Sequence, residues 1–390
     1  MQSFISPENH LVLFAIITGA AAFGIYSEHK KWFGKVSGIL VTMISMSVLS
    51  MTGVVPVASK PEINVEVYNL VFDYFIPLAI PLMLFSSNLV KIIKESGKLL
   101  LAYIIGAIGI VLGSFLAFYL IDLGADSGNT AGVITATLIG GSVNFVATAE
   151  ILNFSTNPLF TATVAIDNFA ANLYVLLLFL VPSIALLKRF FSPSNDTNHE
   201  AEDPDTKTEN KKGITLERIA VSLFIAVLIA GTGTVLAPFV QKLVHTELNM
   251  SILLITILAV LAANLFPKPL KALEQSAFSL GLWLMYIFLA TIGAASNMQD
   301  ILRVGMPVLA FYLTIMFFHL VFMLALAKLF KLDVYEVIIS SAANIMGPSV
   351  AAPMAASLGQ KKMITPAILV GILGYIIGTF IGVSIALILS

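Results

Sequence analysis

The stretch LIGGSVNFVATAE, residues 138–150, lies inside a hydrophobic run that is long enough to cross a bilayer. It nevertheless carries two adjacent glycines, followed by a serine, an asparagine, a threonine and a glutamate. Gly140 and Gly141 allow the backbone to turn where an α-helix would continue. The stretch therefore predicts a membrane segment that is interrupted and that gathers polar groups at the interruption.

The composition indicates an integral membrane protein. The 390 residues are 58% hydrophobic and only 11% charged, whereas soluble domains are about 25% charged; the mean hydropathy is +0.97. A net charge of −1 suggests no nucleic-acid partner, and the absence of cysteine excludes disulfides, thiolate metal sites and cysteine catalysis. Residues 1–10 contain no Lys or Arg, so we expect the first hydrophobic segment to stay as a membrane helix rather than to be a cleaved signal peptide.

A spanning helix needs about 20 mostly apolar residues. By this rule the chain has twelve hydrophobic segments, at 10–27, 36–55, 68–89, 99–121, 130–153, 158–188, 216–240, 249–266, 277–298, 307–330, 335–357 and 363–389. The one long hydrophilic stretch has the composition of a disordered linker and separates the segments six and six. We therefore expect a first repeat at 1–190, a cytoplasmic linker at 191–215 and a second repeat at 216–390.

The two halves resemble each other. The third and ninth segments end in Ser-Asn pairs, at 87–88 and 296–297, and the fifth and eleventh segments are both interrupted. The centre of the eleventh reads NIMGPSVAAPMAA, which places Gly347 in register with Gly141. Internal repeats of this kind are typical of secondary transporters.

The distribution of Lys and Arg favours one threading of the chain. If the fifth and eleventh segments enter the membrane and return on the same side, all of the 21 Lys and Arg lie on one side except Lys60, Lys242 and Arg303. Because basic residues concentrate on the cytoplasmic side, this predicts both termini outside and the linker inside. The expected fold is an all-α polytopic membrane protein with two inverted repeats of five spans, each with an interrupted or re-entrant segment.

The two interruptions are expected to meet in the protein interior. Pro348 breaks the second one by removing a donor and by clashing with the preceding turn, and irregular backbone at membrane depth must be covered by protein or by water. Glycine pairs in membrane helices also serve close packing, and one pair alone would favour that reading. Two breaks at matching positions favour a binding site.

A broken helix offers N–H groups that hold an anion and carbonyl groups that coordinate a cation. Neutral side chains near the breaks add further donors and acceptors, which suit Na⁺ and the polar head of a small substrate. The residues predicted to bind the substrate are Gly140, Gly141, Ser142, Asn144, Asn344, Gly347, Pro348 and Ser349.

Asp167, in the sixth segment, is the main candidate for coupling to an ion. A carboxylate at membrane depth costs about 2.5–3.5 kcal/mol, so it usually faces a cavity and has a function; the alternative is a structural hydrogen bond to a neighbouring helix. Asn168 lies beside it, and Asn172 is either a ligand or an asparagine that bonds across helices. Thr148 and Glu150 complete the predicted set, although Glu150 could equally lie at the outer rim.

Together GGSVNFVATAE (140–150), AIDNFAAN (165–172) and SSAANIMGPSVAAP (340–353) resemble the cation:proton antiporter and anion transporter superfamily, which includes sodium/glutamate and bile-acid sodium symporters. Within it, the chain is similar to a family of uncharacterised bacterial membrane proteins. The resemblance implies a core domain with two interrupted segments and a scaffold domain that often forms a homodimer. It also implies that Asp167 and Asn168 are the ligands of a coupling metal ion. The symporter branch often has Gly-Gly-x-Gly at the break, whereas this chain has Gly-Gly-Ser-Val.

These features predict a Na⁺- or H⁺-coupled symporter of a small organic anion or amino acid, working by alternating access in the cell membrane. The alternatives are a cation/proton antiporter that uses Asp167, and a membrane scaffold that transports nothing. An enzyme is not expected, nor a cofactor other than Na⁺ as coupling ion. Neither a zinc-binding H-E-x-x-H motif nor a nucleophile elbow is present, and the histidines are scattered, at His10, His29, His199, His245 and His319.

Overall fold

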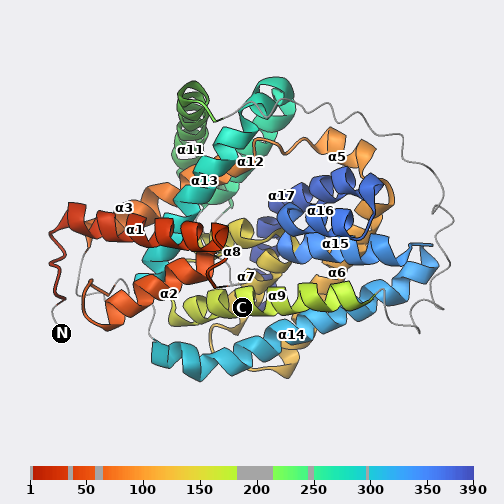
Figure 1. Ribbon diagram of the computed structural model, residues 1–390, viewed down its shortest axis with the longest axis horizontal. Coiled ribbons are helices and arrows are strands. Elements are labelled where there is room, and N and C mark those ends of the chain that lie inside the picture. Colours follow the sequence, from red (N-terminus) through yellow and green to blue (C-terminus); the bar gives the residue numbers. More distant parts are fainter. Residues whose placement is uncertain (1–2, 34–37, 58–64, 182–213, 245–249, 296–297) are drawn as a thin grey trace.

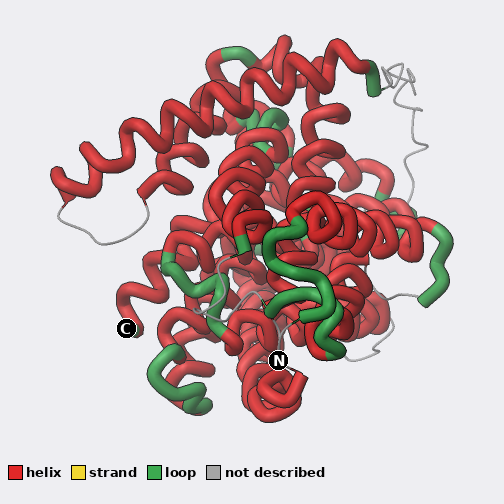
Figure 2. The backbone as a smooth tube through the Cα atoms, turned by 90° about the vertical axis from the view of Figure 1, so that its left-hand side faces the viewer, coloured by secondary structure: helices red, strands yellow, loops and turns green. Residues whose placement is uncertain are grey.

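The computed structural model describes residues 3–33, 38–57, 65–181, 214–244, 250–295 and 298–390. All regular structure within these ranges is helical, as the tube in Figure 2 shows. The linker predicted at 191–215 falls almost entirely outside the described ranges, and so does the Ser-Asn pair at 296–297.

Each of the twelve predicted segments corresponds to a helix or to a run of consecutive helices. In the first half these are α1 (His10–His29), α2 (Gly38–Met51), α3 (Glu66–Leu70), the π-helix η1 (Val71–Phe75), α4 (Ile76–Met83), α5 (Leu89–Glu95), α6 (Gly97–Leu120), α7 (Ser127–Gly140), α8 (Ser142–Ile151) and α9 (Pro158–Leu180). In the second half they are α11 (Leu216–Val244), α12 (Met250–Leu265), α13 (Pro267–Ala295), α14 (Met298–Leu329), α15 (Val334–Met346), α16 (Pro348–Ser357), η3 (Lys361–Met363) and α17 (Ile364–Leu389).

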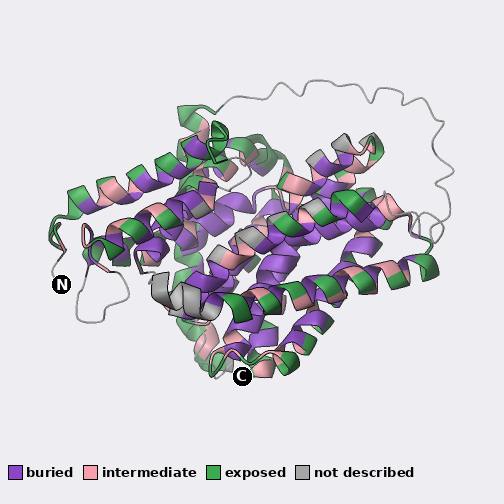
Figure 3. Cartoon of the chain, turned by 60° about the horizontal axis from the view of Figure 1, so that its bottom comes forward, coloured by how far each residue is buried: buried purple, intermediate pink, exposed green. Residues whose placement is uncertain are grey.

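The described helices are those of a polytopic membrane protein. Seven helical stretches in the described residues are long and apolar enough to cross a membrane, counting α3, η1 and α4 as one stretch, and three shorter apolar helices accompany them. Figure 3 shows buried residues through the interior and exposed residues along the outer helix faces. Many of the exposed side chains are large and apolar, among them Leu116, Phe224 and Phe317, as expected for helices that lipid surrounds.

The helices pack as two groups, each of which contains elements from both halves of the chain (Figure 1). The α13 group consists of α1–α4 and α11–α13, and its closest pairings are α13 with α2, α1 with α2 and α11 with α12. The α17 group consists of α6–α9 and α14–α17, and its closest pairings are α17 with α7 and α14 with α6. Packing between the two groups is sparser, and α8 is the element of the α17 group that meets both α4 and α12.

The broken pair α7–α8 returns to the end at which it began. The amide of Asn157, which caps α9, donates to the carboxylate of Asp126, the residue before α7, at 2.8 Å. If α7 and α8 continued in one direction, their 24 helical residues would separate those two positions by about 36 Å. The pair is therefore a hairpin, with Gly141 at its tip.

The second broken pair, α15–α16, enters from the other end of α6. Lys98 Nζ donates to the carbonyl of Lys331 at 3.1 Å, and Ser340 Oγ donates to the carbonyl of Leu99 at 3.1 Å. The start of α15 thus lies beside the start of α6, whereas α7 begins just after the end of α6. The end of α17, at Leu389, borders Gly128 at the start of α7, so the start of α17 lies at the other end of the fold, where α15 begins. The α15–α16 pair is therefore also a hairpin, and the two hairpins enter from opposite ends of the 24-residue helix α6.

Candidate functional site

Both helix breaks turn on a glycine with positive φ. Gly141 has φ 75° and ψ −171°, and Gly347 has φ 71° and ψ −166°, a backbone region that is open essentially to glycine alone. Each glycine N–H still closes the last turn of the preceding helix, from Gly141 to the Thr137 carbonyl at 2.6 Å and from Gly347 to the Ala343 carbonyl at 3.1 Å. Pro348 then occupies the first position of α16, where its missing N–H costs nothing.

The two breaks meet at the ring of Tyr375 on α17. A methyl group built on Gly141 would lie 3.8 Å from Tyr375 Cε1, and one built on Gly347 would lie 3.4 Å from the Tyr375 hydroxyl. Tyr375 is 8% exposed. The breaks from the two halves therefore lie close together, as the sequence predicts, and the aromatic side chain of Tyr375 lies between them.

Glycines on α17 allow both hairpins to reach it. A side chain on Gly371 would collide with the ring and backbone of Pro348, and one on Gly374 would collide with the backbone at Ile139 and Gly140. The packing role that glycine pairs often have in membrane helices thus applies to Gly140. The adjacent Gly141 has the different task of turning the chain.

Asp167 is partly buried and lies beside the first break. Thr137 Oγ1 donates to Asp167 Oδ1 at 3.3 Å, and Thr137 is the residue whose carbonyl receives the Gly141 N–H. The phenol of Tyr312, on α14, neighbours the same carboxylate, and the Tyr312 oxygen is buried with no hydrogen-bond partner among the described residues. Three oxygen groups from α7, α9 and α14 therefore converge here.

The two predicted asparagines at the breaks have different surroundings. Asn144 bonds α17 through both polar atoms of its side chain: its Nδ2 donates to the Gly374 carbonyl at 2.6 Å and its Oδ1 accepts from Thr379 Oγ1 at 3.0 Å. Asn344 donates from Nδ2 to the Tyr103 carbonyl at 3.3 Å, but its buried Oδ1 has no hydrogen-bond partner in the described part of the chain. Asn144 is thus placed to hold α8 against α17, whereas Asn344 keeps an acceptor free.

The other predicted residues are spread more widely. Ser142 is partly buried, and Ser349 is exposed and donates to the Met346 carbonyl at 3.3 Å. Thr148 Oγ1 and Glu150 Oε1 are buried oxygens that lack a hydrogen-bond partner among the described residues. Asn168 and Asn172 belong to α9, but their side chains lie outside what the structure describes.

Sequence reasoning did not find Thr137, Tyr312 and Tyr375. Each lies within an apolar helix, and a single threonine or tyrosine in such a helix has no distinguishing pattern. Thr137 carries a weak signal, since it is one helical turn before the break at Gly141. The contacts of the two tyrosines depend on how α14 and α17 pack against α9 and α7.

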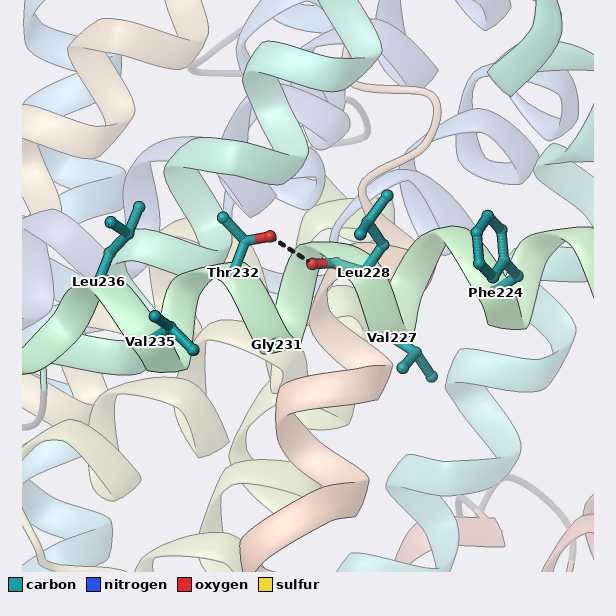
Figure 4. A pocket seen from close by; sticks show the side chains of 7 residues that line it. All are labelled: Phe224, Val227, Leu228, Gly231, Thr232, Val235 and Leu236. Atoms are coloured by element: carbon teal, nitrogen blue, oxygen red, sulfur yellow. Dashed lines mark hydrogen bonds between the residues drawn. The ribbon is translucent and has the colours of Figure 1, made fainter.

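A shallow groove elsewhere on the surface is not part of this site. It runs along α11, which alone supplies its lining (Figure 4). Its one hydroxyl, on Thr232, is already donated to the Leu228 carbonyl at 2.7 Å. The groove is the apolar face of a spanning helix.

The long apolar helices and the two broken hairpins that meet at Tyr375 define a polytopic helical membrane protein. Comparison with known proteins gives the family: residues 15–390 match the model described as "Protein of unknown function (DUF819)", so the chain belongs to that family. It is also 34% identical to the uncharacterized membrane protein YjcL of Bacillus subtilis (strain 168), over 98% of this chain and 97% of the relative.

Proposed function

We propose that the protein is a secondary active transporter that carries a small organic anion or amino acid together with Na⁺ or H⁺. The observation that carries this proposal is the meeting of Gly141 and Gly347 at Tyr375, with Asp167 bonded to the helix that leads into the first break. Discontinuous helices that meet inside the membrane are the usual site of substrate and ion binding in such transporters.

The order of the helices supports two inverted repeats. After the first three segments, each half continues with a long helix, a broken pair and a further long helix: α6, α7–α8 and α9 in the first half, and α14, α15–α16 and α17 in the second. The hairpins enter from opposite ends of α6, as inversion requires. With the basic residues inside, we place the first hairpin on the outer side and the second on the cytoplasmic side of the cell membrane.

The groups around the meeting point of the two breaks suit a hard cation and a small polar solute. The Asp167 carboxylate and the hydroxyls of Thr137 and Tyr312 are all oxygen groups, which hard cations prefer. The N-termini of α8 and α16 begin at the breaks and add the partial positive charge that holds a carboxylate. A carboxylate or a zwitterion could therefore bind without a lysine or arginine.

Transport would use the division into two groups of helices. The breaks and Asp167 belong to the α17 group, and the sparser packing against the α13 group would allow one to move relative to the other. Such a movement would expose the meeting point of the two breaks to each side of the membrane in turn. In the superfamily that the sequence resembles, the scaffold often dimerises, and we propose that the α13 group does so here.

A cation/proton antiporter is the second candidate. It is favoured by Asp167 being the acidic side chain that the described residues place beside the first break. An antiporter would respond to cations and pH but to no organic solute.

A ligand screen by thermal unfolding separates the two candidates, because a ligand that binds the folded state stabilises it. Purified protein is heated with panels of amino acids, monocarboxylates and dicarboxylates, at two pH values, in NaCl or in choline chloride. A symporter should show an organic solute whose stabilisation depends on Na⁺ or on pH. Stabilisation by cation or pH alone would indicate the antiporter, and no response in any condition would contradict both.

A further inference from the structure

A second buried polar cluster lies on α9 and α14, the helices that carry Asp167 and Tyr312, and on α15. His319 Nε2 is 2.9 Å from Ser341 Oγ, and Ser341 Oγ is 2.7 Å from the Tyr174 hydroxyl. On the other side of the ring, His319 Nδ1 is 2.9 Å from the Gly106 carbonyl. His319 and Ser341 are 0% exposed and Tyr174 is 6% exposed.

The partners fix the direction of every hydrogen bond when the imidazole is neutral. A carbonyl oxygen can only accept, so Nδ1 carries the proton and donates to Gly106. Nε2 then accepts from the Ser341 hydroxyl, and the Ser341 oxygen accepts from the Tyr174 hydroxyl. The chain therefore runs from Tyr174 through Ser341 to His319.

A further acceptor, Asn344 Oδ1, lies in the neighbourhood of the ring. His319 Cε1 and Asn344 Oδ1 both border the open side of the Gly106 Cα. The bond from Asn344 Nδ2 to the Tyr103 carbonyl, at 3.3 Å, keeps Oδ1 on this side. Asn344 is 0% exposed, and its Oδ1 has no conventional donor among the described residues.

Both ring nitrogens would keep an acceptor in an imidazolium, because the carbonyl of Gly106 and the oxygen of Ser341 can each accept a hydrogen bond. In an imidazolium both ring nitrogens carry a proton, and the Gly106 carbonyl and the Ser341 oxygen lie within hydrogen-bond distance of Nδ1 and Nε2. From α9, the titratable group in the hydrogen-bonded chain is Tyr174. From the other two helices, α6 contributes the carbonyl of Gly106, and α15 contributes a hydroxyl and an amide, those of Ser341 and Asn344. Asp167 precedes Tyr174 by seven residues, about 10 Å along α9.

We propose that His319 is a proton-binding site of this protein, loaded through the hydroxyls of Tyr174 and Ser341. In the loading step a hydronium ion gives a proton to the Tyr174 oxygen, Tyr174 passes its own proton to Ser341, and Ser341 passes its own to Nε2. One N–H bond forms on His319, both hydroxyls are restored with reversed direction, and one water molecule is left.

His319 lies two helical turns from Tyr312 on α14, and Tyr174 lies two turns from Asp167 on α9. A role of this proton as a coupling ion rests on the proposed transport function. The binding of the proton to His319 does not depend on that function. It can be measured on the purified full-length protein without any solute.

The test is nuclear magnetic resonance of protein labelled with ¹⁵N and ¹³C in the histidine ring, with the His319 signal assigned by its loss in His319→Gln. We expect the neutral Nδ1–H form at high pH and conversion to the imidazolium on acidification, while the protein keeps its thermal unfolding transition. A ring that stays neutral at every pH at which the protein is folded would overturn the proposal. An Nε2–H form at high pH would overturn the hydrogen-bond assignment behind it.

Two adjacent serines on α15 provide a matched pair of variants. Ser341→Ala removes the acceptor that Nε2–H needs, and we expect it to abolish the imidazolium signal. Ser340→Ala removes a buried hydroxyl that bonds the Leu99 carbonyl instead, and the signal should persist. Equal behaviour of the two variants would contradict the chain through Ser341. If His319 titrates but no solute or cation stabilises the protein, the transport function fails and the proton site stands.

Discussion

The side chain of Asn157 donates to the carboxylate of Asp126 at 2.8 Å, although 31 residues separate them. This contact joins the beginning of α9 to the residue before α7, so the intervening segment enters and leaves at one end of the fold. The distribution of Lys and Arg in the sequence favours a re-entrant segment over a crossing one, and this contact agrees with it. The contact also explains how Gly141 comes to lie at the tip of a hairpin.

The hairpin predicts a specific cross-link. Because the sequence has no cysteine, the double variant Asp126→Cys/Asn157→Cys carries the protein's two thiols and should form an intramolecular disulfide on mild oxidation in membranes. The measurement is the mobility shift on a gel that reduction reverses. The control is Asp126→Cys/Lys331→Cys, whose positions lie at opposite ends of α6, about 36 Å apart. An efficient cross-link in the control, and none in the test pair, would contradict the hairpin.

Gly141→Ala should destabilise the protein. The backbone at Gly141 has φ 75° and ψ −171°, and an alanine held in such a conformation costs about 1–3 kcal/mol. We expect a lower thermal unfolding midpoint for the purified variant. Gly231→Ala is the control, since it lies within α11 and a methyl group there meets nothing within 4 Å. If both variants unfold at the wild-type midpoint, the positive-φ break at Gly141 is not a feature of the folded protein.

Asn144→Ala distinguishes a structural role of Asn144 from a substrate-binding one. The substitution removes the donor to the Gly374 carbonyl and the acceptor for Thr379, and leaving such buried groups unpaired costs about 1–3 kcal/mol. We expect a loss of stability measured by thermal unfolding, whereas Ser349→Ala, at an exposed position, should change little. A variant of wild-type stability that no longer responds to a solute found in the ligand screen would instead support substrate binding by Asn144.

The sequence was sufficient for the helices and for the two breaks. Runs of about 20 apolar residues are a strong signal because lipid requires them, and Gly141 and Gly347 stand out because glycine and proline interrupt such runs. The short helix α5 and the π-helix at Val71–Phe75 were not anticipated. Both lie within or next to the third hydrophobic segment, and apolar periodicity does not distinguish a π-helix from an α-helix.

The site was only partly predictable, because its contacts are between distant helices. Asp167 stands out as a carboxylate at membrane depth, but its partner Thr137 comes from a different helix and is an ordinary residue in an apolar run. Asn144 carries the same signal as Asn344, yet the packing of α17 occupies both polar atoms of the first and leaves Oδ1 of the second without a donor. Which polar groups are free depends on the tertiary structure.

The most direct test of the central claim, a cation site beside the meeting point of the two breaks, is the thermal unfolding midpoint as a function of NaCl, with choline chloride at equal ionic strength as reference. It is measured for the wild type, for Asp167→Asn and for Thr137→Val. We predict that the wild-type midpoint rises with NaCl, that Asp167→Asn shows no such rise, and that Thr137→Val needs more NaCl for the same rise, because the carboxylate and the hydroxyl face one site. A rise in Asp167→Asn equal to that of the wild type would contradict this account.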